Sequence, residues 1–203
     1  MKIGLVPISA KPYHRGHHAL VELAASQNDE VLLFVSTSTR SRSGEFPIMG
    51  EAMRQVWTEE LEQILPSNVT PIYGGSPVRK VYEEIENACK QETPDVFTIY
   101  SDPVDTQRNY SVENRENYMS PLCDLGQVIF AAEADPSSVT RGAGTPNIQG
   151  AHLRRALAER DFQTFAASLP AGVDSKNIYD ILSSAAGVTD IPKLAEVFFG
   201  GSF

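Results

Sequence analysis

KIGLVPISAKPYHRGHHALVELA, residues 2–24, is the stretch that decides the fold. Residues 2–9 form a short apolar pattern that predicts a strand, and residues from His17 to about Gln27 repeat at helical spacing. Between the two, three of the chain's four histidines fall within five residues. Imidazoles, a glycine and free backbone N–H groups are therefore expected at one helix N-terminus, which attracts anions and phosphate above all.

The rest of the chain alternates strand patterns with helical patterns. Val31–Val35 is a continuous apolar run, typical of a strand that is covered on both faces. Ser76 before Pro77 indicates the start of a helix. Further strands are predicted at 69–73, 95–100 and 127–131, helices at about 49–66, 77–89 and from 148 onward, and a loop at 133–147, while 102–120 fit no pattern. This order predicts an α/β fold with a doubly wound parallel sheet and C-terminal helices.

The position of the histidines in that fold suggests a ligand site. In doubly wound sheets, ligands bind outside the carboxyl ends of the strands, near the point where the strand order reverses. Residues 11–18 directly follow the first strand. We therefore expect the histidine segment to lie where such sheets bind ligands.

Composition narrows the functional classes. The chain has 203 residues, of which 41% are hydrophobic and 21% charged, and a net charge of −9 that argues against a nucleic-acid binder. No apolar run approaches the length of a membrane span, and no signal peptide is evident, so no membrane partner is expected. Cys89 and Cys123 show neither metal nor redox spacing, which favours reduced thiols in a cytoplasmic protein.

The histidine segment contains the pattern H-x-G-H, as His14-Arg15-Gly16-His17. Patterns for the Walker A loop, the dinucleotide fingerprint and the nucleophile elbow are absent. With its preceding Pro-aromatic pair and following helix, the segment resembles the signature of the H-x-G-H nucleotidylyltransferase superfamily. That superfamily includes the adenylyltransferases of nicotinamide mononucleotide and phosphopantetheine, and the glycerol-phosphate cytidylyltransferases.

A second segment extends the resemblance. Ile148–Arg154, IQGAHLR, stands where the family carries I-S-G-T-x-x-R. The resemblance covers roughly residues 2–170 and implies a Rossmann-like sheet. We accordingly expect a nucleotidylyltransferase domain at 1–170 and a helical C-terminal extension of the same domain at 171–203. The apolar end, Val197–Phe199, packs on the body or on a second subunit, so a homo-oligomer stays open.

The resemblance implies an activity. A nucleoside monophosphate would pass from ATP or CTP to a phosphate-bearing small molecule, with release of pyrophosphate. Mg²⁺ would be bound through the triphosphate, with no metal ligands from the protein. Nicotinamide mononucleotide is the favoured acceptor, and a sugar or polyol phosphate with CTP, or a phosphopantetheine-type acceptor, are the alternatives.

The resemblance and the placement of basic residues also imply site residues. The catalytic candidates are His14, His17 and Arg154. Candidates for nucleotide or phosphate binding are Lys11, Gly16, Arg141, Gln149, Gly150 and Ala151, and candidates for acceptor binding are Arg40, Arg42, Asp102, Asp105 and Arg108. Simpler interpretations are that the histidines cap a helix, that the loop arginines are solvated and that the aspartates cap a turn.

The second segment departs from the family pattern, because Gln149 and Ala151 replace its serine and threonine. Three explanations remain open: Gln149 and backbone groups hold the phosphates, hydroxyls of the preceding loop contribute, or triphosphate affinity is reduced. A nucleotide-binding module without turnover is therefore an alternative function. A metal protein using the histidines is less favoured, since no carboxylate or cysteine stands nearby in the sequence.

Overall fold

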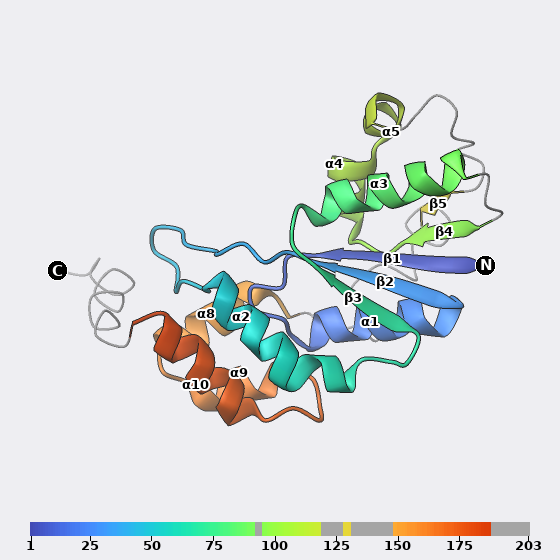
Figure 1. The fold of residues 1–203 in the computed structure, drawn as a ribbon. Helices are drawn as coiled ribbons and strands as arrows, with labels where there is room; N and C mark the ends of the chain where they lie inside the picture. Colours follow the sequence, from blue (N-terminus) through green and yellow to red (C-terminus); the bar gives the residue numbers. More distant parts are fainter. Residues whose placement is uncertain (92–94, 119–127, 131–147, 188–203) are drawn as a thin grey trace. The chain divides into compact units, whose positions relative to one another are not determined.

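The computed structural model describes residues 1–91, 95–118, 128–130 and 148–187 (Figure 1). The predictions for the 133–147 loop, including Arg141, and for Val197–Phe199 lie outside these residues. The chain divides into two compact units. We call them the sheet unit (Met1–Ser9, Ala19–Ser36 and Pro66–Asn147) and the helical unit (Ala10–His18, Thr37–Leu65 and Ile148–Phe203).

The sheet unit contains five parallel strands. They are β1 (Lys2–Ile8), β2 (Glu30–Val35), β3 (Val69–Tyr73), β4 (Val96–Ile99) and β5 (Val128–Phe130), in the order β3-β2-β1-β4-β5. Leu5 pairs with Leu32 on one side and with Ile99 on the other. The strand order reverses between β1 and β4, which makes this the switch point of the sheet.

Helices cover both faces of this sheet. Those of the unit are α1 (Arg15–Gln27, from Ala19 on), α3 (Pro77–Lys90), α4 (Pro103–Tyr110) and α5 (Val112–Tyr118), and α1 and α3 lie on opposite faces (Figure 1). Val81 and Ile85 of α3 pack with Leu5 of β1 in the main apolar cluster. The predicted α/β, Rossmann-like doubly wound sheet is confirmed.

Local sequence signals set several element ends. The Ser76 side chain accepts a hydrogen bond from the Arg79 N–H at 3.4 Å, and Pro77 opens α3 as predicted. Residues 102–120 matched no pattern, yet they form α4 and α5. Asp102 caps α4 by accepting from the Asp105 N–H at 2.9 Å. These two helices are short and polar, so apolar periodicity could not reveal them.

The helical unit contains the predicted 49–66 helix in three pieces. They are α2 (Gly50–Val56), a π-helical turn η1 (Trp57–Leu61) and a 3-10 turn η2 (Glu62–Ile64). The Thr58 hydroxyl donates to the Arg54 carbonyl at 3.2 Å, and such back-bonding loosens the helical ladder. The predicted helical segment is thus present from Gly50 to Ile64, with a hydrogen-bond pattern that changes along its length.

Within the described residues up to 187, the second sequence segment leads into α8 (Gly150–Ala158), and α9 (Phe162–Ala167) and α10 (Ser175–Ala185) follow. The chain leaves the helical conformation between α9 and α10 at Leu169–Pro170. The buried Glu60 carboxylate of η1 accepts from the Asp174 N–H at 2.9 Å and from Asn177 Nδ2 at 2.7 Å. These bonds attach the start of α10 to η1.

Cys89 is disulfide-bonded, so the expectation of a reduced thiol at this position is wrong. Sequence spacing does not show which cysteines meet in space. The cysteines therefore no longer support a cytoplasmic location. Among the described helices, none combines the length and the apolar character needed to cross a bilayer.

Candidate active site

His14 forms the start of α1. Its side chain is buried, and its Nδ1 accepts from the Gly16 N–H at 3.1 Å and from the His17 N–H at 3.3 Å. In return, the His14 N–H donates to His17 Nδ1 at 3.3 Å. This is the reciprocal arrangement of a capping box, with two imidazoles in place of the usual serine and glutamate. It starts α1 at Arg15, two residues earlier than the apolar pattern predicts.

The capping bonds also orient the two rings. The imidazoles of His14 and His17 stack with their centroids 3.8 Å apart and their planes inclined by 27°. Because each Nδ1 accepts from a backbone N–H, the proton of each neutral ring is assigned to Nε2. The site therefore has two adjacent Nε2–H donors.

The backbone N–H groups of the same helix end are already used. Arg15 N donates to the Ser168 carbonyl at 3.0 Å, and His18 N donates to the His14 carbonyl at 3.1 Å. The two N–H groups between them bind His14 Nδ1. The expectation that this helix end offers free backbone donors to an anion is therefore wrong.

Gly16 makes room for the His14 ring. A Cβ atom at Gly16 would lie 2.9 Å from Nδ1 and Cε1 of that ring and 3.4 Å from the Ile148 carbonyl oxygen. The sequence suggested that this glycine lets the backbone approach a phosphate. In the structure, the space over it is taken by His14 and by the chain that leads into α8.

Tyr13 supports the histidines and was not among the predicted site residues. Its buried ring stacks on His17 with centroids 5.4 Å apart and meets the buried Trp57 edge-on at 4.8 Å. Its hydroxyl is hydrogen-bonded to His18 Nδ1 at 3.0 Å. The aromatic residue before the H-x-G-H pattern was the available signal. Trp57 lies in the core.

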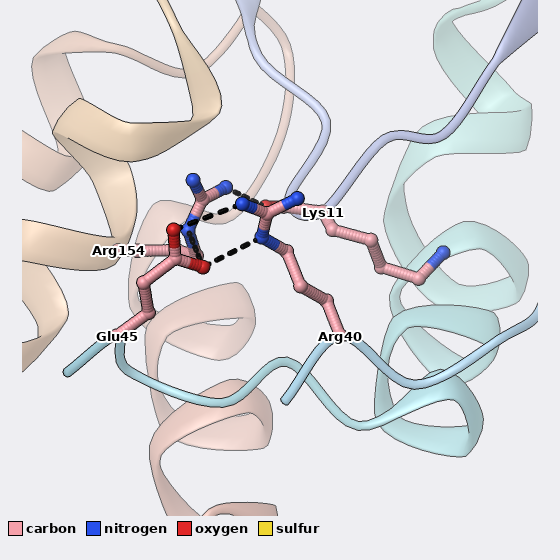
Figure 2. A network of polar contacts seen from close by, with 4 residues as sticks. All are labelled: Lys11, Arg40, Glu45 and Arg154. Carbon is pink, nitrogen blue, oxygen red and sulfur yellow. Dashed lines mark hydrogen bonds and ion pairs between the residues drawn. The ribbon is translucent and has the colours of Figure 1, made fainter. Parts of the chain in front are cut away.

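Arg154 joins the second segment to the first. Its side chain is only 9% exposed, and Nη1 donates to the Lys11 carbonyl at 2.7 Å (Figure 2). A Cβ atom at Gly150 would lie 2.9 Å from Nη1 and 3.2 Å from the Lys11 carbonyl oxygen. Glycine at this position therefore lets the guanidinium reach Lys11.

A carboxylate that the sequence did not suggest lies between two of the predicted arginines. Glu45 accepts two hydrogen bonds from Arg40, from Nε at 2.8 Å and from Nη2 at 2.9 Å (Figure 2). Its Oε2 also lies 3.5 Å from Arg154 Nε. Arg40 itself is held by two backbone hydrogen bonds to Ile48, each 2.9 Å long. An acidic residue five positions after Arg40, in a loop rich in arginine, was the only sequence signal.

The local charges shift three pKa values. The Arg40 hydrogen bonds hold the pKa of Glu45 below its usual value, with a further contribution from Arg154. Burial, reinforced by the Arg40 charge, lowers the pKa of Arg154. Burial lowers the pKa of Lys11 to about 8. The Lys11 side chain is 4% exposed, and it extends away from the Glu45 carboxylate (Figure 2).

The other predicted residues of the helical unit lie at the start of α8 and in the 38–48 loop. Gln149 and Ala151 are exposed. Within the described part of the chain, no hydrogen bond uses the N–H of Gly150 or Ala151. Arg42 is exposed, and its carbonyl accepts from the Glu45 N–H at 3.1 Å in the turn of the loop.

Asp102, Asp105 and Arg108 belong to the sheet unit. Asp102 caps α4, and Arg108 is exposed. Asp105 lines a cavity of about 250 Å³ above the carboxyl ends of β1, β2 and β4, together with Ser9, Ser36, Ser101 and Asn109. This is the switch point of the sheet, and no basic side chain of the described residues lines the cavity.

The described ranges contain no group of three or more histidine, cysteine or acidic side chains placed to hold a metal ion. Of the side chains in Figure 2, only Glu45 is acidic, and it already binds two guanidinium groups. The arrangement is therefore suited to binding an anion and offers no cage for a cation.

No model of a known protein family matches the chain. Over 115 residues, the chain is 26% identical to a protein named nicotinamide-nucleotide adenylyltransferase from Haloarcula marismortui. The match covers 56% of this chain and 59% of that protein, so the chain spans about three-fifths of its relative's length. This similarity supports a nucleotidylyltransferase family for the chain.

Proposed function

We propose that this protein transfers a nucleoside monophosphate from the magnesium complex of a nucleoside triphosphate to a phosphate-bearing small molecule. ATP and nicotinamide mononucleotide are the first pair to test, since the relative is named for the adenylyl transfer. The observations that support the proposal are the stacked imidazoles of His14 and His17 and the hydrogen bond from the buried Arg154 guanidinium to the Lys11 carbonyl, all within one unit.

In the proposed reaction, an oxygen of the acceptor phosphate attacks the α-phosphorus of the triphosphate. A new P–O bond forms, the bond from the α-phosphorus to the bridging oxygen breaks, and pyrophosphate leaves with its electron pair. The reaction needs no protein nucleophile, so the protein contributes positioning and charge stabilisation. The Nε2–H groups of His14 and His17 would donate to the phosphoryl oxygens as negative charge increases.

Arg154 would bind the β- or γ-phosphate. Its guanidinium is fixed by the Lys11 carbonyl, and a planar fork fits phosphate oxygens well. The N–H groups of Gly150 and Ala151 open α8 and would add backbone donors, so no serine or threonine is required there. Lys11 would add a positive charge below about pH 8.

Magnesium enters this proposal as part of the substrate. The charged side chains around Arg154 are basic apart from Glu45, which is already paired with arginines. Mg²⁺ commonly keeps several waters and is held by substrate phosphates. The basic side chains therefore fit the phosphate chain of the complex.

For the acceptor, Arg40 and Arg42 would contact the phosphate group. In the sheet unit, Asp102, Asp105 and Arg108 are proposed separately as acceptor-binding candidates, and the cavity lined by Asp105 suits a polar group without phosphate.

The test is release of pyrophosphate from a panel of triphosphates and acceptors with magnesium. Release that depends on both substrates, and that Arg154→Ala abolishes, would support the proposal. Arg155→Ala is the matched control, because Arg155 is the exposed neighbour of Arg154 and pairs with Glu159 on the same helix. Tight triphosphate binding without any release would instead indicate a nucleotide-binding module, the alternative that Gln149 and Ala151 keep open.

A further inference from the structure

Glu45 occupies the position of an anion between two of the basic groups proposed for phosphate. It makes a two-bond ion pair with Arg40 and a longer 3.5 Å contact with Arg154 Nε (Figure 2). That Nε is buried and makes no hydrogen bond within the described part of the chain. Arg154 therefore makes a hydrogen bond on the Lys11 side and only a longer ion pair on the Glu45 side.

We propose that Glu45 is an internal competitor for the phosphate ligand: its carboxylate holds Arg40 and Arg154 in the ligand-free protein and leaves them when phosphate binds. This inference rests on the proposed function, because it takes a phosphate chain as the ligand. It adds a residue that sets the affinity of the site and its preference among anions.

The geometry allows the carboxylate to leave while the loop stays in place. Phe46 and Ile48 are buried, and Ile48 is paired with Arg40 through two backbone hydrogen bonds. The Glu45 side chain is 31% exposed, so it can rotate into water. Exchange therefore requires a change of side-chain rotamer and no unfolding of the loop.

Charge decides which ligands can make the exchange. A carboxylate carries one negative charge, whereas a triphosphate carries several and has more oxygens for bidentate bonds. Polyphosphates therefore displace Glu45 readily, and anions with a single charge do so poorly. Glu45 therefore weakens the binding of singly charged anions strongly, and it lowers the affinity for polyphosphates to a smaller extent.

The experiment is isothermal titration calorimetry with inorganic tripolyphosphate. Removing the competing charge in Glu45→Gln should tighten binding by about two- to fivefold, the range expected for a partly exposed ion pair. Glu62→Gln is the matched control, because Glu62 lies in the same unit, is 38% exposed and pairs with Arg54. The control loses the same charge and should bind as wild type does.

Glu45→Asp is the second variant. It keeps the charge but shortens the side chain by one methylene, so it cannot bridge both arginines as Glu45 does, and it should also bind more tightly than wild type. If both Glu45 variants bind tripolyphosphate as wild type does, or more weakly, the inference is overturned while the phosphate site stands. If no protein, wild type included, binds tripolyphosphate, the proposed function and this inference both fail.

Discussion

His14 uses its two ring nitrogens differently. Nδ1 caps α1, and the proton of the neutral ring is assigned to Nε2. Replacing His14 with alanine should lower the free energy of unfolding by about 1 kcal/mol, the usual cost of losing an N-cap. Asparagine is a good N-cap, so His14→Asn should keep stability close to wild type. Thermal denaturation of the two variants checks this difference.

The same pair of variants separates capping from catalysis. Both lack Nε2, so both should lose turnover by on the order of 10²-fold or more. A His14→Asn enzyme that turns over as wild type does would show that the ring serves only as a cap. His152→Asn is the control, because that exposed histidine also accepts from a backbone N–H at a helix start, that of Gln149 on α8.

The lowered pKa of Lys11 predicts that triphosphate affinity depends on pH. Burial places its pKa at about 8, so its positive charge is lost as the pH rises through that value. Triphosphate affinity should therefore fall above about pH 8, and wild type should bind as Lys11→Met does by about pH 9.5. Calorimetry across this range is the measurement. An affinity difference between the two proteins that stays constant with pH would contradict the role of Lys11.

Folding stability should change in the opposite direction. The unfolded lysine keeps its proton up to about pH 10.4, whereas the folded one releases it near 8. Between these values the unfolded state binds more protons, so this group makes the free energy of unfolding rise with pH. Lys11→Met should lack that rise, which denaturant titrations at the two ends of the range can measure.

Sequence patterns predicted the site residues that lie in continuous motifs. His14, His17 and Arg154 are identified by short spacings and by their place next to predicted elements. Glu45 was not found, because its pairing with Arg154 joins residues far apart in the chain and depends on how the 38–48 loop folds back. The hydrogen bonds that occupy the backbone N–H groups at the start of α1 were missed for the same reason, because the acceptor of the Arg15 N–H is the distant Ser168 carbonyl.

At the level of elements, α1 and α8 begin in similar ways. Each starts beside a glycine whose missing side chain is replaced by a functional group, the His14 ring over Gly16 and the Arg154 guanidinium over Gly150. Helix interiors usually favour alanine over glycine by about 1 kcal/mol. The close approaches at these two positions should reverse that preference.

Gly150→Ala tests this at α8. The added methyl group should push the guanidinium off the Lys11 carbonyl, lower the melting temperature and weaken triphosphate binding. In an Arg154→Ala background, the loss of stability should be smaller, because the nearest clash is gone. Equal losses in both backgrounds, measured by denaturant unfolding, would show that Arg154 is not the group that requires this glycine.

The elements themselves were predicted unevenly. The buried strands and α3 are long, apolar or clearly capped, and they lie where the patterns place them. The change from α- to π- and 3-10 hydrogen bonding within the 49–66 helix was not predicted, because apolar periodicity does not register the hydrogen-bond pattern of a helix. The helices α4 and α5 were missed because their residues are mostly polar.

For the whole molecule, a net charge of −9 coexists with the basic groups gathered near Arg154. A ligand that binds only the folded state raises the melting temperature, and a concentration of about 100 times Kd contributes roughly 2.7 kcal/mol. Magnesium ATP should therefore stabilise the wild type and Arg155→Ala, and it should not stabilise Arg154→Ala. Differential scanning fluorimetry makes the comparison, and an equal shift in Arg154→Ala would remove Arg154 from the ligand site.

The capping role of the paired imidazoles affects how related chains are judged. In a related chain without nucleotidyl transfer, both rings would still stabilise the start of the first helix, so selection for a folded protein alone would favour them. The presence of these two histidines in a related sequence is therefore weak evidence that the related protein is an active enzyme. Asparagine at position 14 would be the more telling sign, since it preserves the helix start and gives up the chemistry.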